Sequence, residues 1–478
     1  MKDRPIRQEE FIVSQVASFI DENAIHAALA EGKRRASRNE AEAIIKKALA
    51  ADGLTMEEVA VLLNTSDPDL VEEIFKAAKA IKRSIYGNRL VLFAPLYVSD
   101  YCVNNCVYCG YGAGHKFTRR RLTMDEIKTE TLALLNMGHK RIAMEAGEDP
   151  ENCPIDYILD AIQAVYSVET KNANIRRINI NIASTTVEDY KRLHAAEIGT
   201  YILFQETYHR ETYARVHPRG PKSNYDWHTT AFDRAQTAGI DDVGAGVLFG
   251  LYDHKFELLG LMQHAAHLEA EFGVGPHTIS MPRIRPAGGI NLDSFPHIVK
   301  DDDFKKLVAI IRMAVPYTGM IITTREEAGF RNQLLELGIS QLSGGSCTGV
   351  GGYCEENEKG VKQPTQFEVS DDRPLDKVMF DIAEAGHLPS FCTACYRNGR
   401  TGDRFMAMAK VGEIQNLCQP NAILTFKEYL QDFASPTTRE LGEKIIAEHL
   451  KQIPNPKLRA KTEEQLAKIA EGKRDFYF

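Results

Sequence analysis

The sequence has no long basic run and no apolar run that approaches the ~20 residues needed to cross a bilayer. Its first ten residues lack the apolar core of a secretory signal peptide. The formal net charge is −8, so the composition favours neither a nucleic acid nor an anionic membrane as a partner. We therefore expect a cytoplasmic protein that binds neither.

Nine cysteines are present, and most of them lie in two tight groups, which indicates metal sites rather than a disulfide framework. The first group, with C-x3-C-x2-C spacing, is Cys102, Cys106 and Cys109. The second group, with C-x2-C-x22-C spacing, is Cys392, Cys395 and Cys418. Iron–sulfur clusters normally take four cysteines, and structural zinc sites are closed by four ligands. Three thiolates without a fourth nearby therefore indicate a cluster that leaves one iron open for chemistry.

Simpler interpretations of these cysteines remain open at this point. The first group fits a zinc site completed by His115, or a set of unligated core thiols. The second fits a structural zinc site with a remote fourth ligand. The other cysteines, Cys153, Cys347 and Cys354, match no ligand pattern and are interpreted as structural.

The sequence predicts three regions. Residues 1–87 are a helical extension, in which Thr55 to Glu58 form a capping box and Asp67 caps a helix that starts at Pro68. Residues 88–355 form a barrel domain, with a further capping box that begins at Thr123. Residues 356–478 form a mostly helical C-terminal domain that carries the second cysteine group.

The barrel prediction depends on short β-rich apolar runs that alternate with amphipathic helical stretches. The predicted strands are Leu90–Val98, Arg141–Glu145, Ile178–Ala183, Tyr201–Gln205, Val243–Phe249, Thr278–Ile284, Met320–Thr324 and Ile339–Leu342. Eight strands separated by helices predict an α/β fold, a parallel (β/α)8 barrel of the TIM type. In such a barrel the chemistry lies at the carboxyl ends of the strands, and the first cysteine group follows the first strand.

The first cysteine group, with the aromatic Tyr108 before its last member, resembles the radical S-adenosylmethionine (SAM) superfamily. The resemblance implies a [4Fe–4S] cluster that binds SAM, with Tyr108 against the adenine. The turn Ala146, Gly147 and Glu148 is similar to the superfamily's Gly-Gly-Glu turn, which receives the SAM amino group. Ala146 departs from the first glycine of that turn.

The runs Gln205–Tyr213 and His217–Lys222 resemble the aromatic amino acid lyase branch of that superfamily. The branch includes the thiamine-pathway tyrosine lyase and the tyrosine lyase that matures [FeFe]-hydrogenase. The resemblance implies that Glu206 holds the SAM ribose and that Arg234 holds the SAM carboxylate, a group that the planar guanidinium suits. A loop or surface salt bridge is the alternative for each.

The substrate residues are also implied by the branch. Arg325 lies in a Thr-Arg-Glu motif and would bind the carboxylate of the amino acid. Tyr97 matches a tyrosine of the same pocket, although packing inside the barrel is the alternative for both residues. Ser343 and Ser346 belong to a glycine-rich loop and are expected as polar contacts.

The second cysteine group has the spacing of the auxiliary cluster in the hydrogenase maturase, and the thiamine enzyme lacks it. The resemblance implies a second [4Fe–4S] cluster with an additional labile iron. His277 would bind that iron, since imidazole is a suitable iron ligand, and a free cysteine would be a further ligand. A hydrogen-bonded core histidine is the alternative for His277.

The implied reaction is the cleavage of L-tyrosine at its Cα–Cβ bond to p-cresol and dehydroglycine, followed by conversion of dehydroglycine to CO and cyanide. The expected partners are SAM, tyrosine, a reductant such as ferredoxin or flavodoxin, and other hydrogenase maturation proteins. The alternatives are a 2-iminoacetate synthase of thiamine thiazole biosynthesis, a tryptophan-using relative and a non-catalytic iron–sulfur electron carrier. The second cysteine group disfavours the first two, and the SAM-binding motifs disfavour the third.

Overall fold

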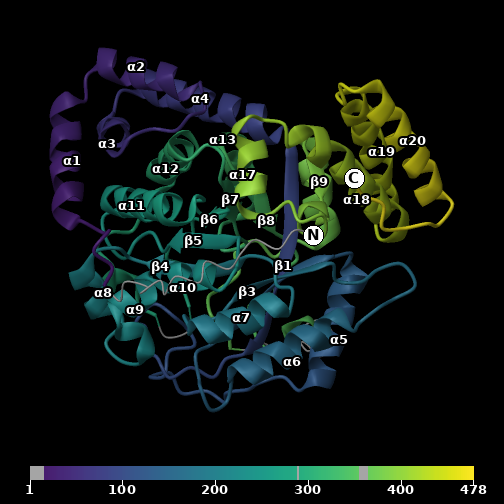
Figure 1. Cartoon of the computed structure of the whole chain (residues 1–478), viewed down its shortest axis with the longest axis horizontal. Helices are drawn as coiled ribbons and strands as arrows, with labels where there is room; N and C mark the ends of the chain where they lie inside the picture. Colours follow the sequence, from purple (N-terminus) through teal and green to yellow (C-terminus); the bar gives the residue numbers. More distant parts are fainter. Residues whose placement is uncertain (1–15, 288–289, 355–363) are drawn as a thin grey trace.

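The computed structural model describes residues 16–287, 290–354 and 364–478. Its strands form a nine-stranded parallel sheet in the order β2-β3-β4-β5-β6-β7-β8-β1-β9, and β1 also pairs with β2. The first eight strands therefore close into a barrel, which lies at the centre of the molecule with helices around it (Figure 1). The predicted (β/α)8 barrel is confirmed.

All eight predicted strands overlap a strand of the barrel. The strands are β1 Arg89–Ser99, β2 Arg141–Ala146, β3 Arg177–Asn181, β4 Tyr201–Glu206, β5 Val243–Val247, β6 Thr278–Ser280, β7 Gly319–Ile322 and β8 Gln341–Ser343. Most of their residues are buried, as expected for parallel strands that are covered on both faces. Their continuous apolar character is the reason why the sequence located them.

The N-terminal extension is helical throughout its described part. Its helices are α1 Glu22–Arg35, α2 Arg38–Ala48, α3 Met56–Asn64 and α4 Pro68–Tyr86. The capping box at Thr55 is present, and Asp67 caps α4 as predicted. The apolar stripe of α4 packs on the barrel helix α12, so the extension covers one side of the barrel (Figure 1).

The helices that surround the barrel connect successive strands. They are α5 Met124–Met137, α6 Ile155–Tyr166, α7 Val187–Ala195, α8 Arg210–Val216, α9 Tyr225–Thr229, α10 Ala231–Thr237, α11 His254–Phe272, α12 Asp301–Ala314 and α13 Ala328–Leu337. The predicted capping box at Thr123 starts α5, and Gly138 ends that helix with a φ of 103°. A residue with a side chain would be strained in this left-handed conformation.

The C-terminal region is mostly helical and also completes the sheet. Its helices are α15 Leu375–Glu384, α16 Ala394–Arg397, α17 Gly402–Lys410, α18 Gln415–Asp432, α19 Pro436–Lys451 and α20 Pro456–Ala470. The strand β9, Leu388–Ser390, pairs in parallel with the first residues of β1. The sequence did not predict β9, because three residues that include a proline carry no strand periodicity. The strand depends on the first residues of β1, which precede the part of β1 that pairs with β2.

No helix in the described parts of the chain has the length and apolar character that a membrane span needs.

A buried ion pair joins the C-terminal helices to the barrel. The Glu428 carboxylate, on α18, accepts hydrogen bonds from Lys140, just before β2, and from Arg176, just before β3, with the second N···O distance at 3.0 Å. The Glu428 and Lys140 side chains have no solvent-accessible surface. Burial alone would raise the pKa of Glu428, but the two cations outweigh it and hold that pKa below its ordinary value. The group is therefore ionised at neutral pH.

We predict that Glu428→Gln destabilises the protein by about 3–5 kcal/mol, because it leaves the buried Lys140 ammonium without its counter-charge. Arg176 would keep only its ion pair with Asp475. Thermal unfolding followed by circular dichroism measures the effect. The control is Glu440→Gln on α19. Its carboxylate forms an exposed pair with Lys444, so this variant should melt at nearly the wild-type temperature. Equal melting temperatures for the two variants would contradict this prediction.

Candidate functional site

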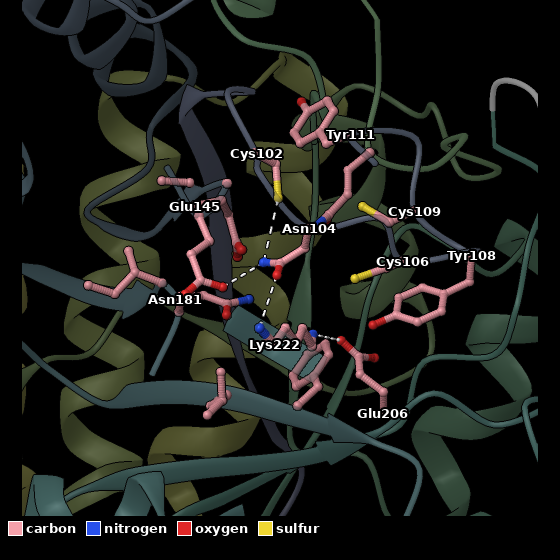
Figure 2. Close-up of a pocket in the computed structure, with 18 of the residues that line it drawn as sticks. Cys102, Asn104, Cys106, Tyr108, Cys109, Tyr111, Glu145, Asn181, Glu206 and Lys222 are labelled. Atoms are coloured by element: carbon pink, nitrogen blue, oxygen red, sulfur yellow. Dashed lines mark hydrogen bonds and ion pairs between the residues drawn. The ribbon is translucent and has the colours of Figure 1, made fainter. Parts of the chain in front are cut away.

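The first cysteine group lies in the loop after β1, at the carboxyl end of the barrel. Figure 2 shows the sulfur atoms of Cys102, Cys106 and Cys109 facing a common space. Backbone hydrogen bonds fix this loop, since the amide of Val103 donates to Glu148 O at 2.8 Å and that of Asn105 to Arg219 O at 3.1 Å. The loops after β2 and β4 therefore hold the cysteine loop in place.

The thiols are held in a poorly solvated environment. Burial raises the pKa of Cys106 to about 12 and that of Cys109 to about 11. In both cases burial is the largest cause, because the thiolate loses its hydration. These thiols therefore stay protonated until a metal replaces their protons, as metal binding to cysteine requires.

A buried amide connects the three loops of this site. Asn104 Nδ2 donates to the Glu148 carboxylate at 2.5 Å and lies 3.8 Å from the Cys102 sulfur. Its Oδ1 accepts the backbone N–H of Lys222 at 2.9 Å. Burial raises the pKa of Glu148, although Asn104 and Lys222 act in the opposite direction. Sequence analysis missed Asn104, although it lies inside the C-x3-C spacer.

The turn after β2 packs directly on the cysteine loop. A Cβ atom added at Gly147 would lie 2.3 Å from the Tyr101 carbonyl oxygen and 3.1 Å from Cys102 Cβ. Gly147, Ala146 and Glu148 all line the same cavity as the three cysteines. The structure thus brings this predicted turn and the cysteine group together, and the absence of a side chain at Gly147 permits the close approach.

The predicted ribose ligand lies in this cavity, but paired with a lysine. The Lys222 ammonium donates to Glu206 Oε1 at 2.7 Å. Burial would lower the pKa of Lys222, but Glu206 and Cys106 outweigh burial and raise it above its ordinary value. Glu206 itself has a φ of 69°, an uncommon conformation for a residue with a side chain. Lys222 is a second cavity residue to which sequence analysis gave no role.

The predicted adenine contact, Tyr108, is oriented by a histidine. Its hydroxyl lies 2.8 Å from His217 Nε2, and His217 Nδ1 lies 2.9 Å from the Tyr213 carbonyl oxygen. Because a carbonyl only accepts, Nδ1 carries the proton and Nε2 accepts from Tyr108. Burial lowers the pKa of His217 well below its ordinary value, so the neutral ring fixes the tyrosine.

Arg234 lies apart from the residues that line this cavity. Its guanidinium stacks on Trp227 at 3.6 Å and donates to the Thr185 and Trp227 carbonyl oxygens at 2.9 and 2.6 Å. Its Nη1 also donates to the Thr230 carbonyl oxygen and hydroxyl at 3.2 and 2.9 Å, so each of the three guanidinium nitrogens makes a hydrogen bond. Its role toward the SAM carboxylate stays a prediction.

The predicted substrate residues line an adjoining cavity, here called the substrate cavity. Its lining includes Tyr97, Arg325 and Ser343, and it shares Arg325 and Glu145 with the cavity of the first cysteine group. The Tyr97 hydroxyl donates to Gln366 Oε1 at 2.8 Å, and Ser343 Oγ accepts the backbone N–H of Thr324 at 3.0 Å. Ser343 therefore lines the substrate cavity and also holds the loop after β7 through this hydrogen bond.

The second cysteine group lies at the opposite, amino-terminal end of the barrel. Cys392 follows β9 directly, Cys395 is on α16 and Cys418 is on α18. These three and His277 line one cavity, here called the lower cavity, although they are far apart in sequence. The hydrogen bond between two of the thiols raises the pKa of Cys395 and lowers that of Cys418.

The imidazole of His277 is suited to bind a metal. His277 is buried, and its Nδ1 lies 3.5 Å from the Asp242 carboxylate without a hydrogen-bond partner among the described residues. Burial lowers the pKa of His277, although Asp242 acts in the opposite direction. The ring is therefore neutral at pH 7, which is the form that binds metals.

Both sites have donors that fit an iron–sulfur cluster. Each presents three thiols in one cavity, and clusters are held by cysteine thiolates. No three His, Cys, Asp or Glu side chains in the described part of the chain converge closely enough to hold a single metal ion.

Sequence analysis did not identify several residues of the lower cavity, because no motif marks them. Arg141 and Asp242 lie at the amino-terminal ends of β2 and β5. Barrel enzymes have their active sites at the opposite, carboxyl ends of the strands. Tyr396 is on α16, and Arg400 lies in the loop between α16 and α17. Only the close packing of the C-terminal region under the barrel reveals this set.

Comparisons with known proteins place the barrel in a class. The model of the radical SAM superfamily matches residues 96–263, and that of the biotin and thiamin synthesis associated domain matches residues 280–388. The 2-iminoacetate synthase of Escherichia coli strain K12 is 28% identical over 347 residues, which is 72% of this chain and 89% of that protein. The barrel and its first cysteine group are thus those of a radical SAM protein, a class defined by a SAM-binding [4Fe–4S] cluster.

Solved structures narrow the assignment. A crystal structure of HydG, a maturase of the [FeFe]-hydrogenase, is 57% identical with a TM-score of 0.94 and covers 97% of this chain and 100% of its own. The maturase HydG from Carboxydothermus hydrogenoformans is 38% identical with a TM-score of 0.79, covering 93% of this chain and 99% of its own. The chain belongs to the HydG family of [FeFe]-hydrogenase maturases.

We predict that Gly147→Ala lowers the iron bound by the first cysteine group and weakens SAM binding at least tenfold, because the new methyl group would displace the cysteine loop. Iron content after anaerobic reconstitution and SAM titration of the reduced cluster's EPR signal measure both. Gly329→Ala on α13 is the control, since a Cβ atom there meets nothing within 4 Å. Unchanged iron and SAM affinity in Gly147→Ala would show that the close contact is not needed.

Proposed function

We propose that this chain cleaves the Cα–Cβ bond of L-tyrosine to p-cresol and dehydroglycine and converts dehydroglycine to CO and cyanide at a second cluster. The observation that carries this proposal is the pair of three-cysteine sites at opposite ends of one barrel. A lyase that releases dehydroglycine needs only the first site. The second site, with its buried histidine, supports a further reaction on the product.

The residues at the carboxyl end of the barrel have distinct tasks in this proposal. Cys102, Cys106 and Cys109 would hold the first cluster, which with bound SAM supplies a carbon-centred radical able to remove a hydrogen atom from the substrate. Tyr108 and Glu206 orient the SAM nucleoside, and Ala146, Gly147 and Glu148 receive its amino group. Arg325 binds the tyrosine carboxylate through two parallel hydrogen bonds, beside Tyr97 and Ser343. The closed barrel keeps water from the reaction.

The residues of the lower cavity would hold the second [4Fe–4S] cluster and the additional iron. Cys392, Cys395 and Cys418 would supply the thiolates. The buried Nδ1 of His277, which makes no hydrogen bond to a residue that the structure describes, supports the role of His277 as ligand of the labile iron. A free cysteine would complete that iron's ligands. The iron would leave with CO and cyanide as the building unit of the hydrogenase H-cluster.

The reaction requires other molecules. An external reductant such as ferredoxin or flavodoxin would supply the electron that starts each turnover, and other hydrogenase maturation proteins would receive the iron product. Membership of the HydG family supports both proposals. The competing function is that of a 2-iminoacetate synthase, which would release dehydroglycine unchanged.

A single anaerobic turnover with SAM, reductant, tyrosine and iron tests the proposal. We expect p-cresol and CO in nearly equal amounts, with p-cresol measured by chromatography and CO by its binding to haemoglobin. The control omits tyrosine and should give neither product. If p-cresol formed without CO although both clusters were intact, the chain would be a 2-iminoacetate synthase and the second site would need another explanation.

The two sites should also be separable by mutation. We predict that the double variant Cys392→Ser, Cys395→Ser keeps p-cresol formation within about threefold of the wild type but forms no iron-bound CO and cyanide, as infrared spectroscopy would detect. The reciprocal variant Cys106→Ala should lose SAM cleavage and every product while its second cluster stays visible by EPR. An iron product from the double variant would contradict this division of labour.

A further inference from the structure

Glu145 has no role in the function proposed above, although it lines both cavities at the carboxyl end of the barrel. It is on β2, where the strand register pairs it with Tyr97 of β1 and with Asn181 of β3. Residues paired on adjacent strands project to the same side of a sheet, and in a barrel they form one layer. Glu145 and Asn181 line both the cavity of the first cysteine group and the substrate cavity, and Figure 2 shows them next to each other.

Arg325 faces the same space from the end of β7. Its guanidinium lies 3.6 Å above the Phe367 ring, and its Nε is buried without a hydrogen-bond partner in the described parts of the chain. The neighbouring carboxylate, Glu326, is bound to Arg283 with an Nε···Oε1 distance of 2.9 Å. Arg325 therefore keeps donors for a ligand that enters the cavity.

The other carboxyl groups that line the substrate cavity or the cavity of the first cysteine group are bound to neighbouring side chains. Glu148 accepts from Asn104, and Glu206 is paired with Lys222. Glu145 has the Asn181 amide as its hydrogen-bond partner and interacts with Arg325 as a charge across the cavity. The substrate cavity thus contains a cation and a carboxyl group at separate positions, which is the arrangement that matches an α-amino acid in its zwitterionic form.

The environment also makes Glu145 a better base. Burial raises the pKa of Glu145 well above its ordinary value, although Asn181 and Arg325 act in the opposite direction. A carboxylate with a raised pKa lies closer to an ammonium group in proton affinity, so a proton moves between them at a smaller cost.

We propose that Glu145 binds the ammonium group of the amino acid whose carboxylate lies on Arg325, and that it takes one proton from that ammonium. In this step one N–H bond breaks and one O–H bond forms, which gives a neutral amine and a protonated Glu145 without any change in electrons. The inference rests on the proposed function. The proton transfer prepares the amino group for removal of a hydrogen atom. A neutral amine then leaves a neutral radical, whereas an ammonium would leave a second positive charge near Arg325.

Ligands that lack one of the two charged groups test the binding half of the proposal. The SAM-loaded holoenzyme is titrated anaerobically with L-tyrosine, with tyramine, which has no carboxylate, and with 3-(4-hydroxyphenyl)propionate, which has no ammonium. Glu145→Gln should weaken tyrosine and tyramine by about 10- to 100-fold and leave the propionate unchanged. Arg325→Gln should weaken tyrosine and the propionate and leave tyramine unchanged.

The rate of turnover tests the second part of the proposal, the transfer of a proton to Glu145. At saturating tyrosine, measured from each variant's own titration, Glu145→Gln should form p-cresol at least about 100-fold more slowly than the wild type. Cleavage of SAM without lyase product should continue, which shows that the first site is intact. Glu151→Gln is the matched control, because this exposed carboxyl group follows in the same loop and should behave as the wild type in both assays.

Two results would overturn the proposal. Wild-type affinities and p-cresol rates in Glu145→Gln would exclude Glu145 from the reaction. An equal loss of affinity for all three ligands would show that Glu145 only maintains the shape of the cavity. A wild-type enzyme that follows the predicted binding pattern but forms no p-cresol would support the ammonium site and refute the proposed function, so the two failures are distinguishable.

Discussion

The long strand β1 is the structural constraint on which both cysteine sites depend. It has 11 residues, and it pairs with β9 at its start, with β8 in its middle and with β2 at its end. At about 3.3 Å per residue, such a strand extends through the full height of the barrel. The first cysteine group follows its carboxyl end, and Cys392 follows the strand that pairs with its amino end. The backbone hydrogen bonds of one strand therefore fix the two sites relative to each other.

Buried polar contacts then give each end of the barrel its shape. At the carboxyl end, Asn104 connects the loops after β1, β2 and β4, so that the cysteines, Glu148 and Lys222 occupy one rigid cavity. At the amino end, Glu428 holds α18 against Lys140 and Arg176, and this helix carries Cys418. An unpaired polar group costs more in a buried environment than at the surface, so these contacts keep loops distant in sequence together.

The sequence predicted the barrel because its strands are buried on both faces and stand out as apolar runs. It also predicted the turn at Gly147, since the motif and the place after β2 agreed, and the structure supplies the physical reason in the contact with Tyr101. It did not predict β9, whose pairing depends on the overhang of β1. It also gave no role to Lys222 or Glu145, because the motifs that marked Glu148, Glu206 and Arg325 imply none for these two residues.

The sequence by itself determined the fold class and the two groups of thiols, because strand periodicity and cysteine spacing are local properties of the chain. Only the tertiary structure decided that the two groups lie at opposite ends of one barrel, and it places His277, which the resemblance had assigned to the second group, in the lining of the lower cavity. It alone placed Arg234 on Trp227 rather than in the cavity lining, and Glu145 in the same space as Arg325. These are relations between residues far apart in sequence, which the closure of the sheet and the packing of helices fix and which no local pattern records.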